Sequence, residues 1–173
     1  MKRLATWFTV LSVCLGLIFL LSHCSRGKKE SALALAPDFT VKTLDGQEIT
    51  LSKLKGKAVL LDFWATWCGP CRESIPHLIQ IYKTNQANGL EVIGISLDKG
   101  DPGTVLNFVK LMEIPYPIAM TTEEVVRSYG VTSLPTTILV DKEGKIREKL
   151  IGFNSAIANA IATRAAELTS EKL

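Results

Sequence analysis

Two cysteines, Cys68 and Cys71, are separated by two residues and stand between an apolar run and the start of a helical pattern. The run over residues 58–64 has the length and composition of a buried strand, interrupted only by Asp62. A cysteine pair with this spacing at a strand-to-helix junction indicates a redox pair rather than half of a zinc site. Zinc needs about four ligands, and the domain adds only His77 to the two cysteines. We therefore predict neither a metal site nor a cofactor.

The order of the two cysteines suggests different chemical roles. Cys68 comes just before the helix predicted over residues 70–85, where unpaired amides and the helix dipole favour a thiolate. Cys71 lies one turn later, within reach of the same sulfur and more buried. Cys68 is thus predicted to attack a substrate disulfide and Cys71 to resolve the mixed disulfide. Gly69 and Pro70 separate them, and Pro70 suits the first helical turn. The alternative, a pair of inert structural cysteines, fits poorly with a position at a helix start.

Hydrophobic periodicity and turn residues predict the other elements. Asp45-Gly46 predicts a hairpin between strands at residues 39–41 and 47–50. Beyond the helix, the expected elements are a strand at 91–97, a helix begun by Asp101-Pro102, a strand at 117–120, a helix capped by Thr121 or Thr122, strands at 136–140 and 145–151, and a final helix capped by Asn154 or Ser155. This order predicts an α/β fold with a central mixed β-sheet flanked by helices and an added N-terminal β-hairpin.

The beginning of the chain differs in character from the rest. Residues 4–22 are mostly apolar and form a run long enough to cross a bilayer. We predict an export signal or membrane anchor over residues 1–23, a linker over 24–36 and the folded domain over 37–173. Export would place the domain on the extracytoplasmic, or periplasmic, face of a bacterial membrane.

Two kinds of tether remain open. Cys24 follows the apolar run in the way that the lipidated cysteine of a bacterial lipoprotein does, although His23 is larger than the residue usual before that cysteine. The run is also long enough to remain as an uncleaved helix. Either tether would hold the domain at a membrane.

Charge and composition exclude other classes of protein. The formal net charge is +3, and Lys2 and Arg3 supply two of these charges. A nucleic-acid-binding protein would need a much stronger basic field, so we expect no nucleic-acid partner. The hydrophobic share is 47%, and its excess over that of an ordinary domain lies near the N-terminus, which argues against a polytopic membrane protein.

Several motifs together resemble one family. Residues 67–71, Trp-Cys-Gly-Pro-Cys after an apolar strand, resemble thioredoxin, and the wider pattern resembles its membrane-tethered TlpA/ResA-like branch. The motifs that carry this second resemblance are Ala36-Pro37-Asp38-Phe39, Leu44-Asp45-Gly46, the turn with Leu51, Lys55, Gly56 and Lys57, Phe63-Trp64-Ala65-Thr66-Trp67, and Leu134-Pro135-Thr136-Thr137. The resemblance runs from about residue 37 to residue 153. It implies a thioredoxin-like fold and a thiol–disulfide oxidoreductase.

The resemblance also implies roles for individual residues. Pro135 matches the family's cis-proline, which would expose the backbone of Leu134 for pairing with a substrate. Asp62 matches the buried acid of thioredoxin; inside an apolar strand its pKa should be raised, which suits proton exchange with Cys71. Trp67 would cover the site and shape the contact surface, along with Gly69 and Pro70.

The chain departs from the family pattern at three positions. Many relatives in the cytochrome c maturation branch carry asparagine where this chain has Asp62, and glutamate where it has Ser74. The lysine that often pairs with the buried acid of thioredoxin is replaced near Gly94. We expect this replacement to leave the ionised form of Asp62 less stabilised.

The function that the resemblance implies is reduction of disulfides in exported proteins, such as apocytochrome c, with electrons from a membrane donor of the CcdA/DsbD type. One alternative is a peroxiredoxin-like peroxide reductase, but no Pro-x-x-x-Thr run precedes Cys68. Another is a tethered metallochaperone or binding module, but no histidine follows Leu134.

Overall fold

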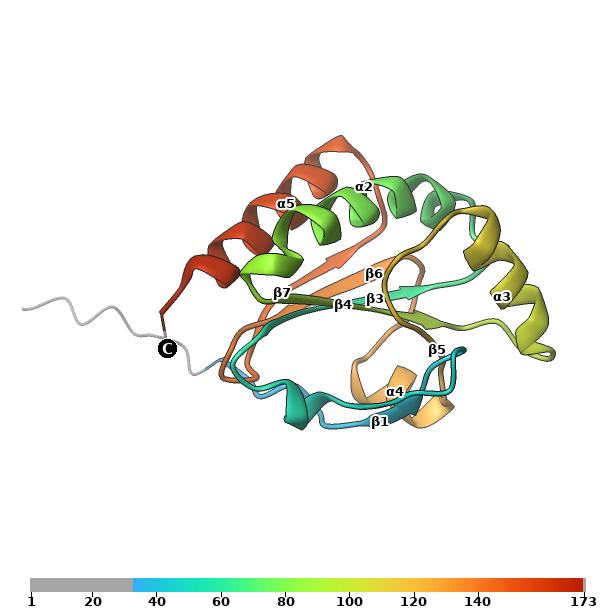
Figure 1. Ribbon diagram of the computed structural model, residues 1–173, viewed down its shortest axis with the longest axis horizontal. Helices are drawn as coiled ribbons and strands as arrows, with labels where there is room; N and C mark the ends of the chain where they lie inside the picture. The colour runs from blue at the N-terminus through green and yellow to red at the C-terminus, as the bar shows by residue number, and fades with distance from the viewer. Residues whose placement is uncertain (1–32, 173) are drawn as a thin grey trace, which may run out of the picture. The chain divides into compact units, whose positions relative to one another are not determined.

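The computed structural model describes residues 33–172, and a five-stranded sheet organises them (Figure 1). The strand order is β5–β4–β3–β6–β7, in which β3, β4 and β5 are parallel and β6 and β7 continue antiparallel. The strands are β3 (Ala58–Trp64), β4 (Leu90–Ser96), β5 (Ile118–Met120), β6 (Thr136–Val140) and β7 (Ile146–Ile151). The sheet is therefore mixed, which confirms the predicted fold class.

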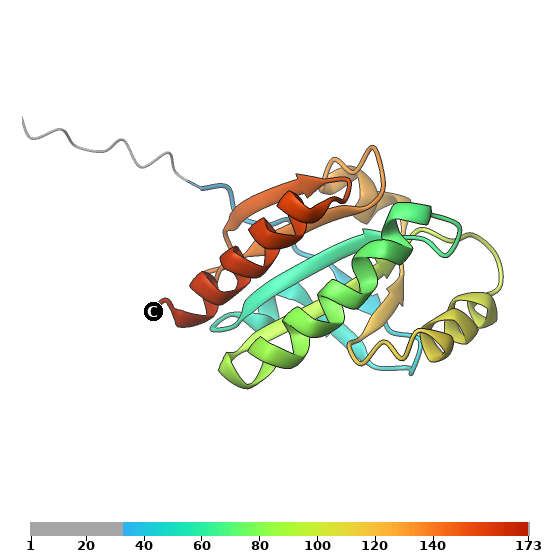
Figure 2. The same ribbon diagram turned by 90° about the horizontal axis from the view of Figure 1, so that it is seen from above.

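Helices cover both faces of this sheet (Figures 1 and 2). Two long helices, α2 (Gly69–Asn85) and α5 (Ser155–Ser170), lie side by side over one face. The shorter α3 (Pro102–Leu111) packs against the same core as these two. The opposite face is covered by α4 (Glu123–Ser128), the N-terminal hairpin and the 3-10 helix η1 (Leu51–Leu54). A single-turn 3-10 helix, η2 (Gln86–Asn88), ends α2.

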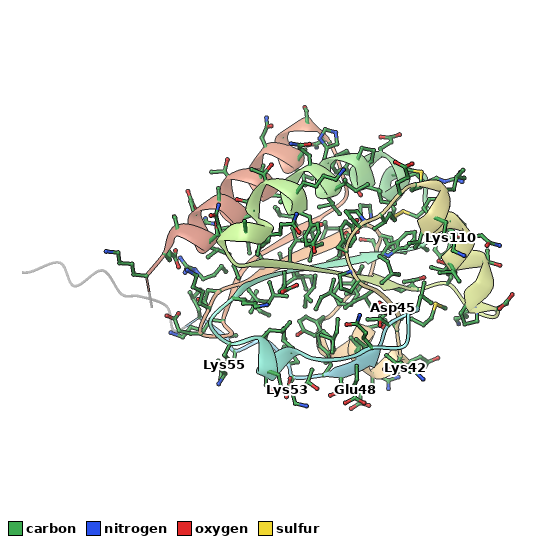
Figure 3. All side chains as sticks on the ribbon, viewed as in Figure 1. Lys42, Asp45, Glu48, Lys53, Lys55 and Lys110 are labelled. Carbon is green, nitrogen blue, oxygen red and sulfur yellow. A yellow bond between two sulfur atoms is a disulfide. The ribbon has the colours of Figure 1, made fainter. Side chains whose placement is uncertain are left out.

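The predicted N-terminal hairpin is present. Its strands β1 (Thr40–Lys42) and β2 (Glu48–Thr50) pair antiparallel. Gly46 in the turn has φ +90°, a conformation that favours glycine. The side chains at alternate positions, among them those of Lys42 and Glu48, point away from the sheet into solvent (Figure 3). The hairpin therefore covers the core with one face and leaves the other hydrated.

Strand β3 is buried on both sides, which explains its nearly continuous apolar sequence. Val59, Leu61 and Phe63 join the core under α4 and the hairpin. Leu60 and Trp64 join the core under α2 and α5. Because side chains alternate along a strand, Asp62 faces the α2 side together with Leu60 and Trp64. The buried carboxyl and the helix that carries the cysteines thus share one core.

The helix starts are capped by the residues that the sequence indicates. The side chain of Asp101 accepts from the Gly103 N–H at 2.9 Å, and Pro102 occupies the first turn of α3. Of the two candidates before α4, Thr122 is the cap; before α5 it is Asn154. Each such cap satisfies an amide that would otherwise lack a partner.

The first described residues pair with the turn between β6 and β7. The Ile146 N–H donates to the Ala34 carbonyl and the Ala36 N–H donates to the Gly144 carbonyl, both at 2.9 Å. The predicted leader over residues 1–23 and the candidate lipidation site Cys24 lie outside the described residues. Within residues 33–172, no helix has the length and apolar character needed to cross a membrane.

Candidate active site

Cys68 and Cys71 lie where β3 leads into α2, at the carboxyl-terminal edge of the parallel strands. They are joined by a disulfide, and their Cα atoms are 5.3 Å apart. Cys68 is the N-cap of α2 and accepts a hydrogen bond at Sγ from the Cys71 N–H at 3.2 Å. Pro70 occupies the first turn, where its missing N–H costs no helical hydrogen bond. The first sulfur thus lies at the start of α2 and receives a hydrogen bond from a helix-terminal amide, which favours a thiolate when the pair is reduced.

The two sulfurs differ in access to solvent. Cys68 is 6% exposed, whereas Cys71 is fully buried in the core beneath α2. Gly69 and Pro70 between them are exposed. A large substrate can therefore reach only the Cys68 sulfur, and Cys71 can react only with the partner held at Cys68.

A groove opens beside Cys68. It has a volume of about 500 Å³, and its walls come from the active-site loop and the segment before β6. Trp67, 70% exposed, forms one rim, and Leu134 lies on the other side. The structure thus brings Cys68, Trp67, Pro70 and Leu134 into one groove, while Gly69 lies next to it in the chain.

The Leu134–Pro135 peptide bond is cis, and Pro135 is buried behind the groove. The Pro135 carbonyl accepts from the Gly152 N–H at 2.8 Å, which ties this turn to the end of β7. Within residues 33–172, no hydrogen bond engages the backbone N–H or carbonyl of Leu134. These two groups are free to pair with an extended chain in the groove.

Asp62 is 1% exposed and poorly paired. Its Oδ1 accepts from Thr137 Oγ1 at 3.5 Å, and its Oδ2 has no hydrogen-bond partner among the described residues. Burial raises the pKa of Asp62 to about 7, and the bond from Thr137 only partly offsets this effect. Burial, together with the charge of Asp62, also raises the pKa of Tyr116.

Gly94 explains why no cation pairs with Asp62 from β4. Gly94 lies directly opposite Asp62 in the β3–β4 register. A Cβ atom placed on Gly94 would lie 2.4 Å from Ile118 Cδ1 and 3.1 Å from Trp64 Nε1. Neighbouring side chains therefore fill the space that a longer residue would need, and the Asp62 carboxyl stays in an apolar setting.

Asp98 has a role in the site that sequence reasoning did not identify. Its carboxylate accepts from the Thr66 N–H at 2.9 Å and from Thr66 Oγ1 at 2.6 Å, and Ser96 Oγ donates to it at 2.8 Å. These bonds clamp the loop before Cys68 to the end of β4. A signal was available, because polar residues that follow neighbouring parallel strands meet at the same sheet edge.

His77 lies away from the groove. It is exposed on α2, and its ring stacks near Phe153 with centroids 5.3 Å apart. In the described part of the chain, no three His, Cys, Asp or Glu side chains are grouped so that they could hold a metal ion. The site brings together the two sulfurs, the buried carboxyl of Asp62 and the free backbone groups of Leu134.

The chain is similar in sequence and in fold to known proteins. The family model described as AhpC/TSA family matches residues 33–149. The "Thiol-disulfide oxidoreductase ResA" of Bacillus cereus (strain ATCC 10987 / NRS 248) is 36% identical over 144 residues, which is 83% of each chain. The crystal structure of a thiol:disulfide interchange protein of the thioredoxin family from Chlorobium tepidum TLS superposes with a TM-score of 0.73 at 30% identity, covering 82% of this chain and 99% of that one. A further crystal structure, the pneumococcal exposed lipoprotein thioredoxin from Streptococcus pneumoniae, has a TM-score of 0.66 at 30% identity and covers 76% and 100%.

Proposed function

The chain belongs to the AhpC/TSA family of thioredoxin-fold proteins and is a thiol–disulfide oxidoreductase, and from this premise we propose that it reduces disulfides in exported proteins while tethered to the outer face of a bacterial membrane. The observation that carries the proposal is the unequal access of the two sulfurs. Cys68 opens into the groove, whereas Cys71 is sealed in the core. Such a pair suits a two-step exchange in which one sulfur meets the substrate and the other releases it.

The first step is attack by the reduced enzyme. The Cys68 thiolate attacks one sulfur of the substrate disulfide, a new S–S bond forms, and the other substrate sulfur leaves as a thiolate that takes a proton from solvent. An extended substrate segment pairs with the free backbone groups of Leu134 and is held beside Pro135 and Trp67. The Cys71 N–H at the start of α2, together with the helix dipole, stabilises the attacking thiolate.

The second step needs a base inside the core. The Cys71 thiol gives its proton to the Asp62 carboxylate and attacks Cys68 Sγ, which breaks the mixed disulfide. The second substrate thiolate leaves and is protonated, so the substrate gains two electrons and two protons while Cys68 and Cys71 become a disulfide. With a pKa of about 7, Asp62 is present in both protonation states near neutral pH and can accept and release this proton.

A reductant outside the cytoplasm must be recharged, because disulfides persist in that compartment. We propose a membrane electron donor of the CcdA/DsbD type that reduces the Cys68–Cys71 disulfide. Apocytochrome c, whose haem-binding cysteines must be reduced, is the proposed substrate. The Gly69-Pro70 pair between the cysteines supports the reducing direction, because thioredoxin, at about −270 mV, carries the same dipeptide.

The tether is proposed to be either the helix of residues 1–23 or a lipid on Cys24. The name of the pneumococcal relative, an exposed lipoprotein, supports the lipid. Metabolic labelling with a radioactive fatty acid distinguishes the two tethers, since a Cys24→Ala variant loses the label only if a lipid is attached there.

The decisive experiment uses two cysteine variants of the full-length protein. Cys71→Ser keeps the attacking sulfur and lacks the resolving one, so it should accumulate mixed disulfides with its substrates in cells. Those complexes should disappear on treatment with a reductant, and mass spectrometry should identify exported proteins in them. Insulin reduction should fall to the uncatalysed rate in Cys68→Ser.

Three outcomes would contradict the proposal. Insulin reduction by Cys68→Ser at the wild-type rate would remove Cys68 from the chemistry. Rapid turnover of hydrogen peroxide by the reduced domain, without disulfide exchange, would favour a peroxiredoxin-like reductase. Tight copper binding by the reduced pair, again without exchange, would favour a metallochaperone.

A further inference from the structure

The segment that joins α4 to β6 presents Leu134 and yet has little regular structure of its own. Residues 131–135 form neither helix nor strand, and Thr132 and Ser133 are exposed. The Ser133 carbonyl accepts from Thr136 Oγ1 at 2.7 Å, which shapes the turn but does not attach it to another element. The position of the Leu134 backbone therefore depends on what holds the two ends of this segment.

Both ends are held from the edge strand β7. At the far end, the Pro135 carbonyl accepts from the Gly152 N–H at 2.8 Å. At the near end, Lys149 Nζ donates to the Tyr129 carbonyl at 2.9 Å and to the Gly130 carbonyl at 2.7 Å. Because β7 is itself paired with β6 along its length, these contacts fix the segment to the central sheet.

The Lys149 ammonium group suits the end of α4. The last carbonyls of a helix lack partners within the helix, and the partial negative charge of the helix dipole gathers there. Gly130, with φ +57°, ends α4, and a Cβ atom placed on it would lie 3.4 Å from Lys149 Nζ. The charged group thus packs directly against the turn and satisfies two of its carbonyls.

The helix end has a second attachment that does not involve Lys149. The Tyr129 hydroxyl donates to the Pro37 carbonyl at 2.6 Å. The Tyr129 ring packs against Phe39 and Phe63, with centroids 5.9 and 5.6 Å apart. Loss of Lys149 should therefore loosen the segment that follows α4 while the helix stays in place.

We propose that Lys149 is a positioning residue for substrate binding: its ammonium group fixes the segment that presents the Leu134 backbone to the substrate polypeptide. This inference rests on the proposed function. Lys149 does not line the Cys68 groove. Without its hydrogen bonds the segment must be ordered when an extended chain pairs with Leu134, and this ordering lowers the affinity. The cysteines are carried by α2, so the exchange chemistry is not affected.

The test compares two substrates of the full-length protein. One is a short synthetic peptide whose single cysteine forms a mixed disulfide with a small thiol; the other is a small aromatic disulfide that cannot pair with Leu134. In Lys149→Met we expect the KM for the peptide to rise about fivefold, equivalent to about 1 kcal/mol, with kcat unchanged. Reduction of the small disulfide should keep its rate, and dividing by that rate cancels any loss of folded enzyme.

Two further variants show whether the hydrogen bonds of Lys149 are the cause. Lys149→Arg keeps a charged donor and should restore most of the affinity for the peptide. Lys110→Met is the matched control, because Lys110 is exposed on α3 and its removal should leave the KM at the wild-type value (Figure 3).

A second peptide connects Lys149 to the Leu134 backbone. N-methylation on both sides of its cysteine removes the N–H groups that would donate to the Leu134 carbonyl. The wild type should bind this peptide less well than the first, and Lys149→Met should distinguish the two peptides less, because the two changes affect one interaction.

The outcomes separate this inference from the exchange chemistry. An unchanged peptide KM in Lys149→Met, or a loss of equal size with both peptides, would overturn it. Loss of the small-disulfide reaction in both Lys149→Met and Lys149→Arg would also overturn it, since Lys149 would then support the whole fold. Failure of the proposed function would instead appear as a wild-type protein that does not reduce the peptide, or as a Cys68→Ser variant that does.

Discussion

Burial of Asp62 makes the stability of the folded protein depend on pH. The pKa of this carboxyl rises from its ordinary 3.8 to about 7 in the folded protein because of desolvation. Between these two values the folded protein holds a proton that the unfolded chain has released. The contribution of Asp62 to the free energy of unfolding is therefore largest below pH 4 and falls as pH rises, by about 4 kcal/mol in total once the pH is above 7.

Asp62→Asn should remove this dependence, because the amide stays neutral at every pH. We expect the variant to match the wild type near pH 4 and to exceed its free energy of unfolding by a few kcal/mol at pH 8. Urea denaturation of the oxidised proteins at a series of pH values measures the difference. A wild-type curve parallel to that of the variant from pH 4 to pH 8 would show that Asp62 titrates normally.

The loop between β3 and α2 is held in place by hydrogen bonds to Asp98, which follows β4. Thr66 donates twice to Asp98, once from its backbone and once from its hydroxyl. Thr66→Val removes only the hydroxyl bond to a charged acceptor, which should lower the free energy of unfolding by about 2 kcal/mol. Thr66→Ser keeps the hydroxyl and is the matched control. Chemical denaturation checks both, and equal losses in the two variants would rule out this hydrogen bond as the cause.

The helices and strands could be predicted from the sequence, whereas the contacts between them were harder to predict. The apolar run at 58–64 coincides with β3, and Asp101 caps α3 as expected, because both depend on neighbouring residues. The burial of Asp62 also follows from its apolar neighbours. The bond from Thr66 to Asp98 joins residues 32 positions apart and depends on the register of β3 against β4. Sequence periodicity does not fix that register.

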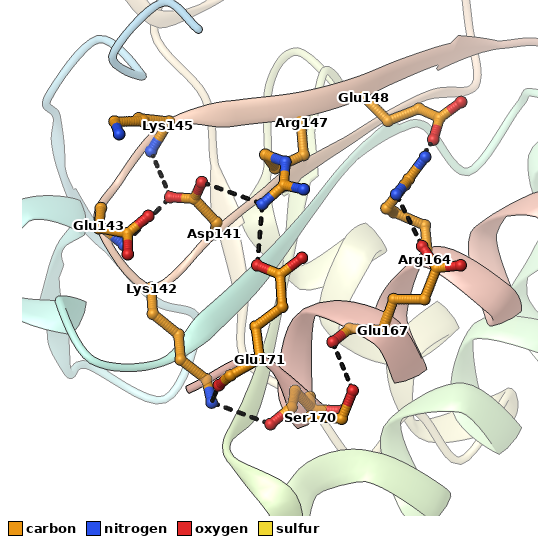
Figure 4. Close-up of polar contacts among 11 residues, drawn as sticks. Asp141, Lys142, Glu143, Lys145, Arg147, Glu148, Arg164, Glu167, Ser170 and Glu171 are labelled. Carbon is orange, nitrogen blue, oxygen red and sulfur yellow. Dashed lines mark hydrogen bonds and ion pairs between the residues drawn. The ribbon is translucent and has the colours of Figure 1, made fainter. Parts of the chain in front are cut away.

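The two ends of the sheet carry different parts of the molecule. The cysteines and the Cys68 groove lie at the carboxyl end of β3 and β4. The other end holds the β6–β7 turn, where residues 34–36 enter the fold and α5 ends (Figures 1 and 4). Lys142 Nζ donates to the Thr169 carbonyl at 2.9 Å, which fixes the last turn of α5 to this loop. The Cys68 groove thus lies at the opposite end of the sheet from the point where the N-terminal segment joins.

Asp141 organises the end of the sheet away from the chemistry (Figure 4). Its buried carboxylate accepts from the N–H groups of Glu143 and Lys145 at 3.0 and 2.8 Å, and from Arg147 at 3.5 Å. A hydrogen bond with Glu171 raises the pKa of Arg147, so the guanidinium stays charged and links the turn to the end of α5. Removal of the carboxylate would leave two backbone donors without their acceptor, while Arg147 would keep its bond to Glu171.

We therefore expect Asp141→Ala to lower the free energy of unfolding by about 2–3 kcal/mol. Reduction of a small disulfide at Cys68 should keep its wild-type rate, because the change lies at the far end of the sheet. Lys57→Ala, which breaks a half-exposed pair with Glu91, is the comparison and should cost less than about 1 kcal/mol. Urea denaturation and a disulfide-reduction assay on the same samples test both statements. Equal destabilisation by the two variants would mean that burial does not strengthen the hydrogen bonds of Asp141. A slower reaction at Cys68 in Asp141→Ala would mean that the two ends of the sheet are coupled.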